Sequence, residues 1–349
     1  MAYHPEFTVS PRLVRLIEEI AALRSRIMTA TVQVAWVPAL QQDARVRNAH
    51  SSTAIEGNPL TLEQVRSLAE GRTPANATAR SRREILNYFA GLRWIERHAG
   101  PSPIRHEHVL KLHRLLASGV MDQGEPGTYR TIAVRVGRHL PPPSAQVSGL
   151  MAELLAWWNA EAVHWSPVIS SACLHFRFED IHPFADGNGR VGRALALWEL
   201  YRRGFDTHHL FAVDEFYWED RPRYYAAFNA VRGSGRNLTS WLEYTAEGLH
   251  ATLGKVWSRI QRLTANLGSS PIVLRPKQEH LLQLLSERQG LTPREVWDAL
   301  GVSKQGAINL IKPLLEAKLI QRVGTRKSGR YILASRSKHP APKTRPRSA

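Results

Sequence analysis

Twelve residues, from His182 to Arg193, restrict the fold of this chain more than any other part of its sequence. They read His-Pro-Phe-Ala-Asp-Gly-Asn-Gly-Arg-Val-Gly-Arg and lie between an apolar helical run, Val168 to Phe178, and a second helical pattern, Val191 to Tyr201. The glycines on either side of Asn188 let the backbone turn sharply and direct successive N–H groups into one concavity at the start of the second helix. A concavity of this kind binds anions.

The side chains around this concavity carry the groups needed for chemistry on a phosphate. Arg190 and Arg193 lie three residues apart in the first helical turn, so both guanidinium groups can reach one phosphate chain. Asp186 is a hard oxygen ligand beside it, which favours Mg²⁺ bridging phosphate oxygens. His182, four residues before Asp186, can be neutral near physiological pH and could deprotonate an incoming hydroxyl. Together these groups predict nucleotidyl or phosphoryl transfer.

The whole string resembles the signature of the Fic family, His-x-Phe-x-(Asp/Glu)-Gly-Asn-Gly-Arg-x-x-Arg, and matches it at every specified position. The resemblance extends to the residues from Pro126 to Arg130 and to the Pro141–Pro143 run, which look like the family's flap. Tyr224-Tyr225 and Trp241-Leu242 look like its downstream helices. Roughly residues 30 to 250 are covered.

This resemblance implies a protein adenylyltransferase that moves AMP from Mg·ATP to a Ser, Thr or Tyr hydroxyl of a target protein or of the chain itself. In that family the flap binds the target segment as an added strand. The implied roles are His182 as base, Phe184 as buried anchor, Asp186 as Mg²⁺ ligand, and Gly187, Asn188, Gly189, Arg190 and Arg193 as the phosphate cradle. Tyr224 and Tyr225 would border the adenine, and because neighbouring helical residues point about 100° apart, we expect only one of them, Tyr225, to do so.

A second motif precedes the catalytic region. Ser52-Thr-Ala-Ile-Glu56-Gly57 resembles the inhibitory motif of many Fic proteins, (Ser/Thr)-x-x-x-Glu-(Gly/Asn). The resemblance implies that Glu56 pairs with Arg193 in a bidentate geometry and keeps it from the γ-phosphate. The alternative is a solvated Glu56 at the end of a helix that Gly57 terminates.

The apolar periodicity predicts a mainly α-helical protein. We expect an N-terminal helical region with the inhibitory helix (1–110), a catalytic core (111–262) and a C-terminal domain (271–333), followed by a disordered basic tail (334–349). The β-rich run from Gly127 to Gly137 predicts a short β-hairpin flap near 127–142.

The C-terminal part is strongly basic. Residues 271–349 hold 16 Lys and Arg against 5 Asp and Glu, so +11 of the chain's net charge of +17 lies there. Thr292, Pro293 and Glu295 predict a helix start, and a further helix from Lys304 would bury Ile308, Ile311 and Leu315 and expose Lys304, Gln305, Asn309 and Lys312. The order of elements resembles a winged helix-turn-helix, which implies DNA binding. Protein docking, or a merely solvated cationic tail, is the alternative.

Other features bear on location and on rival functions. No apolar run is long enough to cross a bilayer, Met1 to Arg12 does not read as a signal peptide, and Cys173 is the only cysteine and is expected to be buried, so we expect a soluble cytoplasmic protein that contacts no membrane. Two rival functions stay open. One is a Fic enzyme that transfers another phosphate-containing group or removes AMP, and the other is a DNA-binding regulator whose Fic core senses nucleotides.

Overall fold

The chain divides into two parts. The computed structural model describes residues 3–30, 37–137, 139–205, 208–265, 276–288, 290–317, 319–325 and 329–334. They belong to two compact units, which we call the core unit (Met1–Met28 and Ala39–Leu263) and the C-terminal unit (Thr29–Pro38 and Thr264–Ala349).

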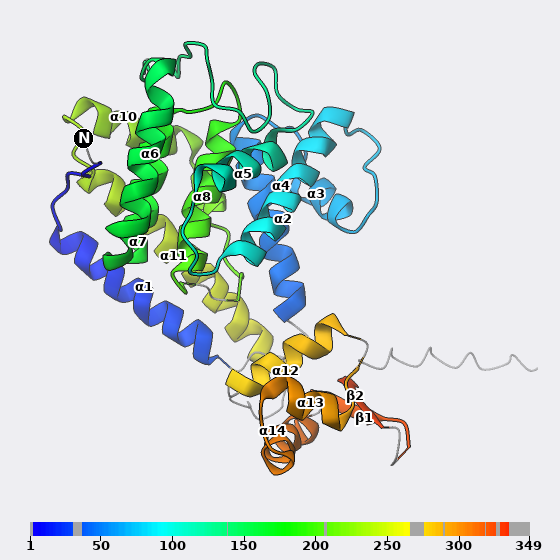
Figure 1. The fold of residues 1–349 in the computed structure, drawn as a ribbon. Helices are drawn as coiled ribbons and strands as arrows, with labels where there is room; N and C mark the ends of the chain where they lie inside the picture. The colour runs from blue at the N-terminus through cyan, green and yellow to red at the C-terminus, as the bar shows by residue number, and fades with distance from the viewer. Residues whose placement is uncertain are drawn as a thin grey trace, which may run out of the picture. The chain divides into compact units, whose positions relative to one another are not determined.

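The core unit is built from helices (Figure 1). The expectation of a mainly helical fold is confirmed. In chain order its helices are α1 (Pro11–Thr29), α2 (Val37–Ile55), α3 (Leu62–Ala69), α4 (Ala79–His98), α5 (His106–Ala117), α6 (Ser144–Ala160), the 3₁₀ turn η1 (Ala162–His164), α7 (Pro167–Ile181), α8 (Asn188–Arg202), α9 (Val213–Glu219), α10 (Arg221–Gly233) and α11 (Thr239–Ala265). The boundary expected at residue 110 falls inside α5.

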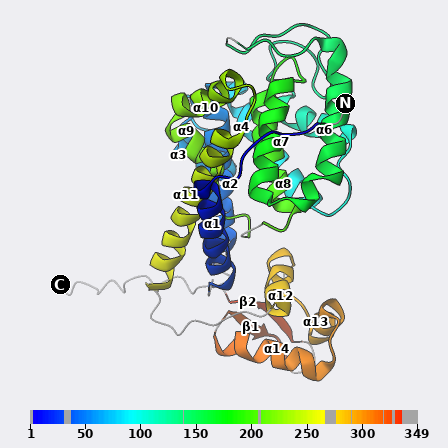
Figure 2. The same cartoon turned by 90° about the vertical axis from the view of Figure 1, so that its left-hand side faces the viewer.

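Two antiparallel helices, α7 and α8, form the centre of the core unit. They pack along each other, with α6 against α7, and with α4 and α5 against α8 (Figures 1 and 2). Of the fifteen residues of α7, all but Pro167 and Arg177 are buried. Cys173 is among them as a free buried thiol, as expected, and burial raises its pKa. The short loop between α7 and α8 is therefore held at both ends by the core.

The end of α2 and the start of α3 are set by local residues. Helix α2 ends at Ile55, and Gly57 follows with a φ of +97° that a residue with a side chain rarely adopts. Thr61 and Gln64 form a capping box at the start of α3, each side chain accepting from the other residue's backbone N–H.

The flap differs from its prediction. Among the described residues of 127–142, β-pairing is limited to one antiparallel bridge between Val136 and His139, closed by two backbone hydrogen bonds, so the predicted short hairpin is present there only as a single bridged turn. A hairpin needs an apolar face to pack on. Here Ile132 and Leu140 are 43% and 65% exposed, and the described residues of the core unit contain no strand for the flap to pair with. In this segment the carbonyl oxygen of Thr131 accepts from the hydroxyl of Ser144, and that of Ile132 accepts from Nη1 of Arg130.

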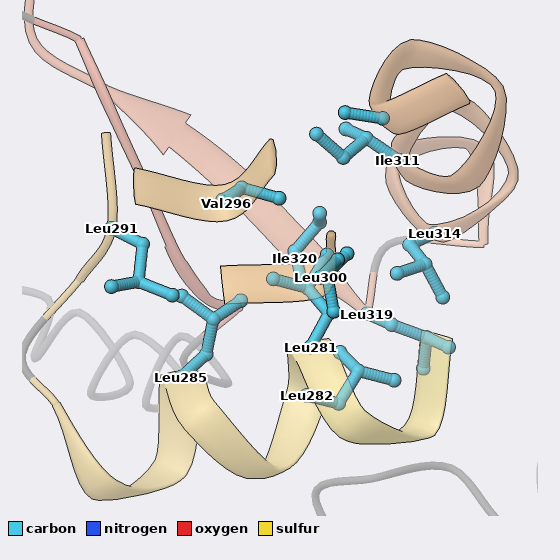
Figure 3. Close-up of a cluster of buried hydrophobic side chains, with 11 residues drawn as sticks. Leu281, Leu282, Leu285, Leu291, Val296, Leu300, Ile311, Leu314, Leu319 and Ile320 are labelled. Atoms are coloured by element: carbon cyan, nitrogen blue, oxygen red, sulfur yellow. The ribbon is translucent and has the colours of Figure 1, made fainter. Parts of the chain in front are cut away.

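The C-terminal unit combines three helices with one two-stranded sheet: α12 (Pro276–Glu287), α13 (Pro293–Leu300), α14 (Lys304–Glu316), β1 (Ile320–Val323) and β2 (Arg330–Leu333). The strands are antiparallel, with Ile320 opposite Leu333. Thr292 and Glu295 form the predicted capping box of α13. The leucine-rich core of this unit draws on all three helices and on β1 (Figure 3), and includes Leu281, Leu285, Val296, Leu300, Ile311, Leu314 and Ile320.

Helix α14 buries a different face from the one predicted. Ala307, Ile311 and Leu314 are buried, whereas Ile308 and Leu315 are 45% and 37% exposed. The buried set keeps the spacing of four and three, and each exposed residue follows a buried one, which turns it about 100° away from the core. The prediction that Lys304, Gln305, Asn309 and Lys312 are exposed is confirmed.

Two further expectations concern membrane-spanning helices and the C-terminal tail. Among the described residues, no helix has both the length and the apolar character needed to cross a membrane. The expected disorder of the tail concerns residues that, apart from Ala334, lie outside the described ranges.

Candidate active site

The loop from His182 to Gly187 is held in a special backbone conformation. His182 caps the end of α7 with a left-handed φ of 51°, and Gly187 opens α8 with a φ of 80°. A left-handed histidine is uncommon and persists where its surroundings hold it. The guanidinium group of Arg130 does so, because its Nε donates to the carbonyl oxygen of His182 at 2.8 Å.

Arg130 also connects this loop to the flap. Its Nη2 donates to the carbonyl oxygen of Pro142 at 2.6 Å, its Nη1 to that of Ile132 at 3.0 Å, and its backbone N–H to that of Pro183 at 2.9 Å. The side chain is only 5% exposed. One buried cation thus fixes the loop that carries His182 to the flap at Ile132 and Pro142.

The side chain of Asn188 forms two hydrogen bonds to the backbone of the loop. Its Oδ1 accepts from the backbone N–H of Phe184 at 2.9 Å, and its Nδ2 donates to the carbonyl oxygen of the same residue at 2.8 Å. Phe184 is fully buried, as expected of an anchor. The side chain of Asn188 is therefore occupied by the loop, so that only its backbone N–H is left for a phosphate.

His113 supports the loop from α5. Its ring stacks on Phe184, with centroids 3.6 Å apart and planes inclined by 6°. Its Nδ1 accepts from the backbone N–H of Gly127 at 2.8 Å, which assigns the proton to Nε2, and Nε2 in turn donates to the carbonyl oxygen of Asp186 at 3.0 Å. Burial lowers the pKa of His113 to about 4, so the ring is neutral.

This neutral ring predicts a pH-dependent stability. Unfolded His113 takes up a proton near pH 6.5 but the folded residue only near pH 4, so the free energy of unfolding should fall by up to about 3 kcal/mol as the pH is lowered between these values. In His113→Phe, which keeps the stacking, that part of the slope should vanish, and the loss of both hydrogen bonds should cost about 1–3 kcal/mol at neutral pH. Urea unfolding at several pH values measures both effects. His4→Ala, whose side chain is 82% exposed, should keep the parental slope, and an unchanged slope in His113→Phe would contradict the assignment.

Asp186 is oriented by hydrogen bonds to its carboxylate. Oδ1 accepts from the backbone N–H of Gly187 at 2.5 Å, and Oδ2 accepts from that of Asp122 at 3.2 Å. No group of three or more His, Cys, Asp or Glu able to hold a metal occurs among the described residues. Mg²⁺ commonly binds through one or two carboxylates together with substrate phosphates, so a single oriented carboxylate beside a phosphate cradle fits that ion.

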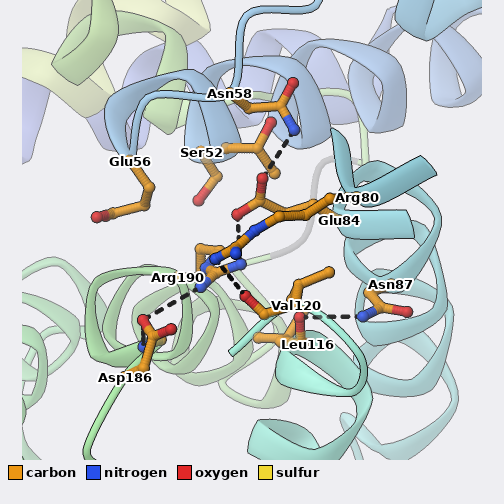
Figure 4. Close-up of polar contacts among 12 residues, drawn as sticks. Ser52, Glu56, Asn58, Arg80, Glu84, Asn87, Leu116, Val120, Asp186 and Arg190 are labelled. Atoms are coloured by element: carbon orange, nitrogen blue, oxygen red, sulfur yellow. Dashed lines mark hydrogen bonds and ion pairs between the residues drawn. The ribbon is translucent and has the colours of Figure 1, made fainter. Parts of the chain in front are cut away.

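The two arginines of the cradle are both paired with carboxylates from the N-terminal helices. Arg190 and Arg193 are 4% and 2% exposed. Arg190 forms an ion pair with Glu84 of α4, and Glu84 also accepts from Nδ2 of Asn58 at 2.8 Å (Figure 4). On its other side, Arg190 lies 3.6 Å from Oδ1 of Asp186.

Arg193 is held by the end of α2. Its Nη2 donates to Oε1 of Glu56 at 2.7 Å, while Nε and Nη2 donate to the hydroxyl and carbonyl oxygens of Ser52, each at 2.8 Å. The expected pairing of Glu56 with Arg193 is present, but its bidentate geometry is wrong, because Ser52 takes the Nε edge of the guanidinium group. Asp214 lies 3.9 Å from Nε on the buried side.

Glu56 covers the floor of the cradle. A Cβ atom added at Gly189 would lie 2.2 Å from its Oε1, so the carboxylate touches the backbone that forms the nest. Burial opposes its charge, but Arg193, with smaller contributions from Arg190 and Arg221, holds its pKa below the usual range. Glu56 is therefore an anion, about a third exposed, at a place built for an anion.

The expected site residues meet around one large cavity of about 1130 Å³. Tyr224 is buried and its hydroxyl lies 3.1 Å from Nε2 of His175, whereas Tyr225 is 38% exposed. Both line the cavity, and Tyr225, the more exposed of the two, has the guanidinium group of Arg221 over its ring at 5.4 Å. The lining includes, from the predicted set, Glu56, His182, Asp186, Gly187, Asn188, Gly189, Arg193, Tyr224 and Tyr225. Ser52 and Arg190 lie directly behind this surface, through their contacts with Arg193 and Asp186.

Comparison with known proteins identifies the domain that holds this loop. Residues 103–200 match the model of the Fic/DOC family. The chain is also similar to a Fic family protein from Desulfovibrio desulfuricans G20, with 26% identity and a TM-score of 0.65, over 97% of this chain and 100% of that structure. Residues 103–200 are therefore similar to the Fic/DOC domain, and the chain shares its fold with that Fic family structure.

Similarity to curated relatives is limited to part of their length. "Protein adenylyltransferase Fic" of Culex quinquefasciatus is 33% identical over 169 residues, which are 47% of this chain and 34% of that protein. The protein of the same name from Drosophila erecta is 31% identical over 194 residues, which are 55% of this chain and 39% of that protein. The matched region thus spans little more than a third of these relatives.

Proposed function

We propose that this protein is an adenylyltransferase that transfers AMP from Mg·ATP to a hydroxyl side chain of a target protein or of itself. The observation that carries the proposal is that His182 and the glycine-rich anion nest line the same cavity of about 1130 Å³. A base and a phosphate cradle facing one space can hold a hydroxyl and a nucleotide within reaction distance. The names of the curated relatives agree with this reaction.

In the proposed reaction the hydroxyl oxygen attacks the α-phosphorus of ATP while His182 takes its proton. The bond from the α-phosphorus to the bridging oxygen breaks, and pyrophosphate leaves with that electron pair. The N–H groups of Gly187 to Gly189 and the guanidinium group of Arg193 bind the phosphate oxygens and stabilise the developing charge. Asp186 would hold Mg²⁺, which neutralises the phosphate oxygens.

Glu56 restrains this reaction in the proposed mechanism. Its carboxylate bonds to Arg193 and touches Gly189, so it occupies space and charge that a γ-phosphate requires. ATP then binds with its triphosphate displaced and its α-phosphorus out of line with the hydroxyl, a misalignment that can cost orders of magnitude in rate.

The target segment docks along the flap in this proposal. Thr131, Ile132 and Ala133 are exposed, and among the described residues they pair with no second strand; the carbonyl oxygens of Thr131 and Ile132 accept from the side chains of Ser144 and Arg130. An extended peptide can add to such an edge as a strand. A reducing compartment such as the cytoplasm suits a chain whose one cysteine, Cys173, is a free thiol.

Mass spectrometry of the modified protein tests the reaction. The Glu56→Gly variant is incubated with Mg·ATP and a cell lysate, and each modified peptide is sequenced. A mass gain of one AMP on Ser, Thr or Tyr supports the proposal. Transfer of a different phosphate-containing group, or removal of AMP from a protein that already carries it, would assign the site to the rival Fic reactions.

For the C-terminal unit we propose DNA binding by a winged helix-turn-helix, with α14 entering the major groove. Lys304, Gln305, Asn309 and Lys312 are exposed along this helix, and lysines facing phosphate release counter-ions on binding. The rival function, a DNA-binding regulator whose Fic core only senses nucleotides, shares this feature. It would make DNA-dependent behaviour indifferent to His182→Ala.

This proposal predicts salt-dependent binding of the full chain to duplex DNA. Lys304→Glu with Lys312→Glu should weaken binding at low salt at least about tenfold and reduce the slope of log affinity against log salt by about 2. Fluorescence anisotropy at several salt concentrations measures this. The matched control reverses two exposed charges of the core unit, Arg72 and Lys255, and should bind like the parent. If the full chain binds no duplex even at low salt, the C-terminal unit is a protein-docking module instead.

A further inference from the structure

A buried carboxylate faces the imidazole of His182 from within α7. Glu179, three residues earlier, is 8% exposed, and its Oε2 lies 3.6 Å from Nδ1 of His182. Nδ1 of His182 and Oε1 of Glu179 are both buried, and neither has a hydrogen-bond partner among the described residues. Unsatisfied buried polar atoms are costly. The gap of 3.6 Å is longer than a hydrogen bond, and a small closure of it would pair Nδ1 of His182 with the Glu179 carboxylate.

Gly192 makes room for this carboxylate. A Cβ atom added at Gly192 would lie 2.3 Å from Oε1 of Glu179 and 3.2 Å from the ring of Phe178. Position 192 is one of the two unspecified positions of the Fic signature between Arg190 and Arg193. In this chain its glycine allows α7 and α8 to enclose a glutamate directly behind the base.

We propose that Glu179 is a positioning residue for His182, an inference that rests on the proposed transfer reaction. Its carboxylate accepts the Nδ1–H of the imidazole and so fixes the tautomer in which the Nε2 lone pair is free to accept the proton of the incoming hydroxyl. The same carboxylate stabilises the imidazolium that forms during transfer. A carboxylate behind a catalytic histidine serves both purposes in other enzymes that use histidine as a base.

Several other charged or titratable groups lie around this pair and set the background for any pH effect. Arg130 bonds to the backbone of His182 from the flap, and His139 of the flap is bound to Asp180 of α7. Helix α10 contributes Arg232 and Tyr224, both of which interact electrostatically with Glu179. Of these groups, Glu179 is the one whose side chain forms an ion pair with protonated His182.

The experiment uses the full chain with Glu56→Gly as the active parent and compares Glu179→Gln and Glu179→Asp. In Glu179→Gln we expect transfer to fall on the order of 10²-fold with Mg·ATP binding retained. The acid limb of its pH–rate profile should move to lower pH, because the anion that favours imidazolium is gone. Glu179→Asp should regain part of the rate. Glu63→Gln, whose side chain is 79% exposed, is the matched control and should match the parent.

A second measurement does not depend on activity. Nitrogen-15 NMR of labelled histidine, with His182→Ala identifying the signals, reports which ring nitrogen carries the proton. We expect the proton on Nδ1 in the parent and a changed tautomer in Glu179→Gln. If neither the tautomer nor the acid limb changes in Glu179→Gln, Glu179 does not position the base. If the tautomer changes but no variant transfers AMP, the proposed function fails and the positioning role of Glu179 stands.

Discussion

Replacing Glu56 by glycine is expected to raise AMP transfer, including self-modification, by about tenfold or more. The change removes the carboxylate from Arg193 and from the backbone of Gly189. The two bonds from Arg193 to Ser52 remain, so the guanidinium group stays in the cradle and can bind the γ-phosphate. Incorporation of labelled AMP by parent and variant measures the gain.

Two further variants show whether the gain comes through Arg193. Glu56→Gly combined with Arg193→Ala should lose most of it, because the freed guanidinium group is what confers it. Glu70→Gly, at another helix end and with a side chain 47% exposed, should leave transfer as in the parent. If Glu56→Gly does not change the rate of AMP transfer, Glu56 is only a residue at a helix end. Its loss then costs roughly 1 kcal/mol or less of stability.

Lowering the pH is not expected to release Arg193 in the way that Glu56→Gly does. The lowered pKa of Glu56 means that its pairing with Arg193 contributes stability above the usual carboxyl pKa and is lost only as the pH falls through the lower, folded value. Between about pH 5 and pH 8 the carboxylate stays charged, so the parent should stay restrained over that range. A change of pH within that range is therefore not expected to free Arg193 from Glu56.

The second large effect is expected for His182→Ala. In the Glu56→Gly background this change should lower transfer by about 10² to 10⁴, the range ascribed to a general base, while calorimetry shows Mg·ATP binding largely retained. Arg193→Ala is the matched comparison and should weaken nucleotide binding instead. Transfer by the alanine variant at the rate of its active parent would contradict the role of His182 as base.

The candidate loop could be predicted from sequence because its determinants are local. The glycines, Asn188 and the two arginines lie within one short segment and one helical turn, and the motif that contains Ser52 and Glu56 is as compact. What local pattern did not reveal was that Ser52 would hold one edge of Arg193 and so exclude a bidentate pair.

The residues that support the loop were not predicted, because they reach it from distant parts of the chain. Arg130 bonds to His182 across 52 residues, His113 to Asp186 across 73, and Glu84 to Arg190 across 106. Each of these three residues lies in a helix or loop whose local sequence does not indicate its partner. Arg130 lies within the stretch that resembles the flap, so the flap resemblance was the one signal that could have identified it.

In the flap and in α14, by contrast, the local sequence pattern predicted more than the fold forms. It predicted more strand pairing in the flap, and burial of more apolar residues in α14. β-branched residues from Thr131 to Val136 favour strands, but without a sheet to pack on they form only one bridge. In α14 several apolar residues offered more than one possible face, and the packing of α12, α13 and β1 selected the one with Ala307, Ile311 and Leu314.

Glu84 and Glu56 give the phosphate cradle its own internal counter-ions. Two guanidinium groups buried one helical turn apart would repel each other and would be costly to remove from water. With a carboxylate on each, the cradle can reach its final shape during folding, before any nucleotide is present. Under the proposed function, ATP would compete for positions already filled by the protein's own acidic side chains, and its affinity would reflect an exchange of anions rather than the filling of an empty site.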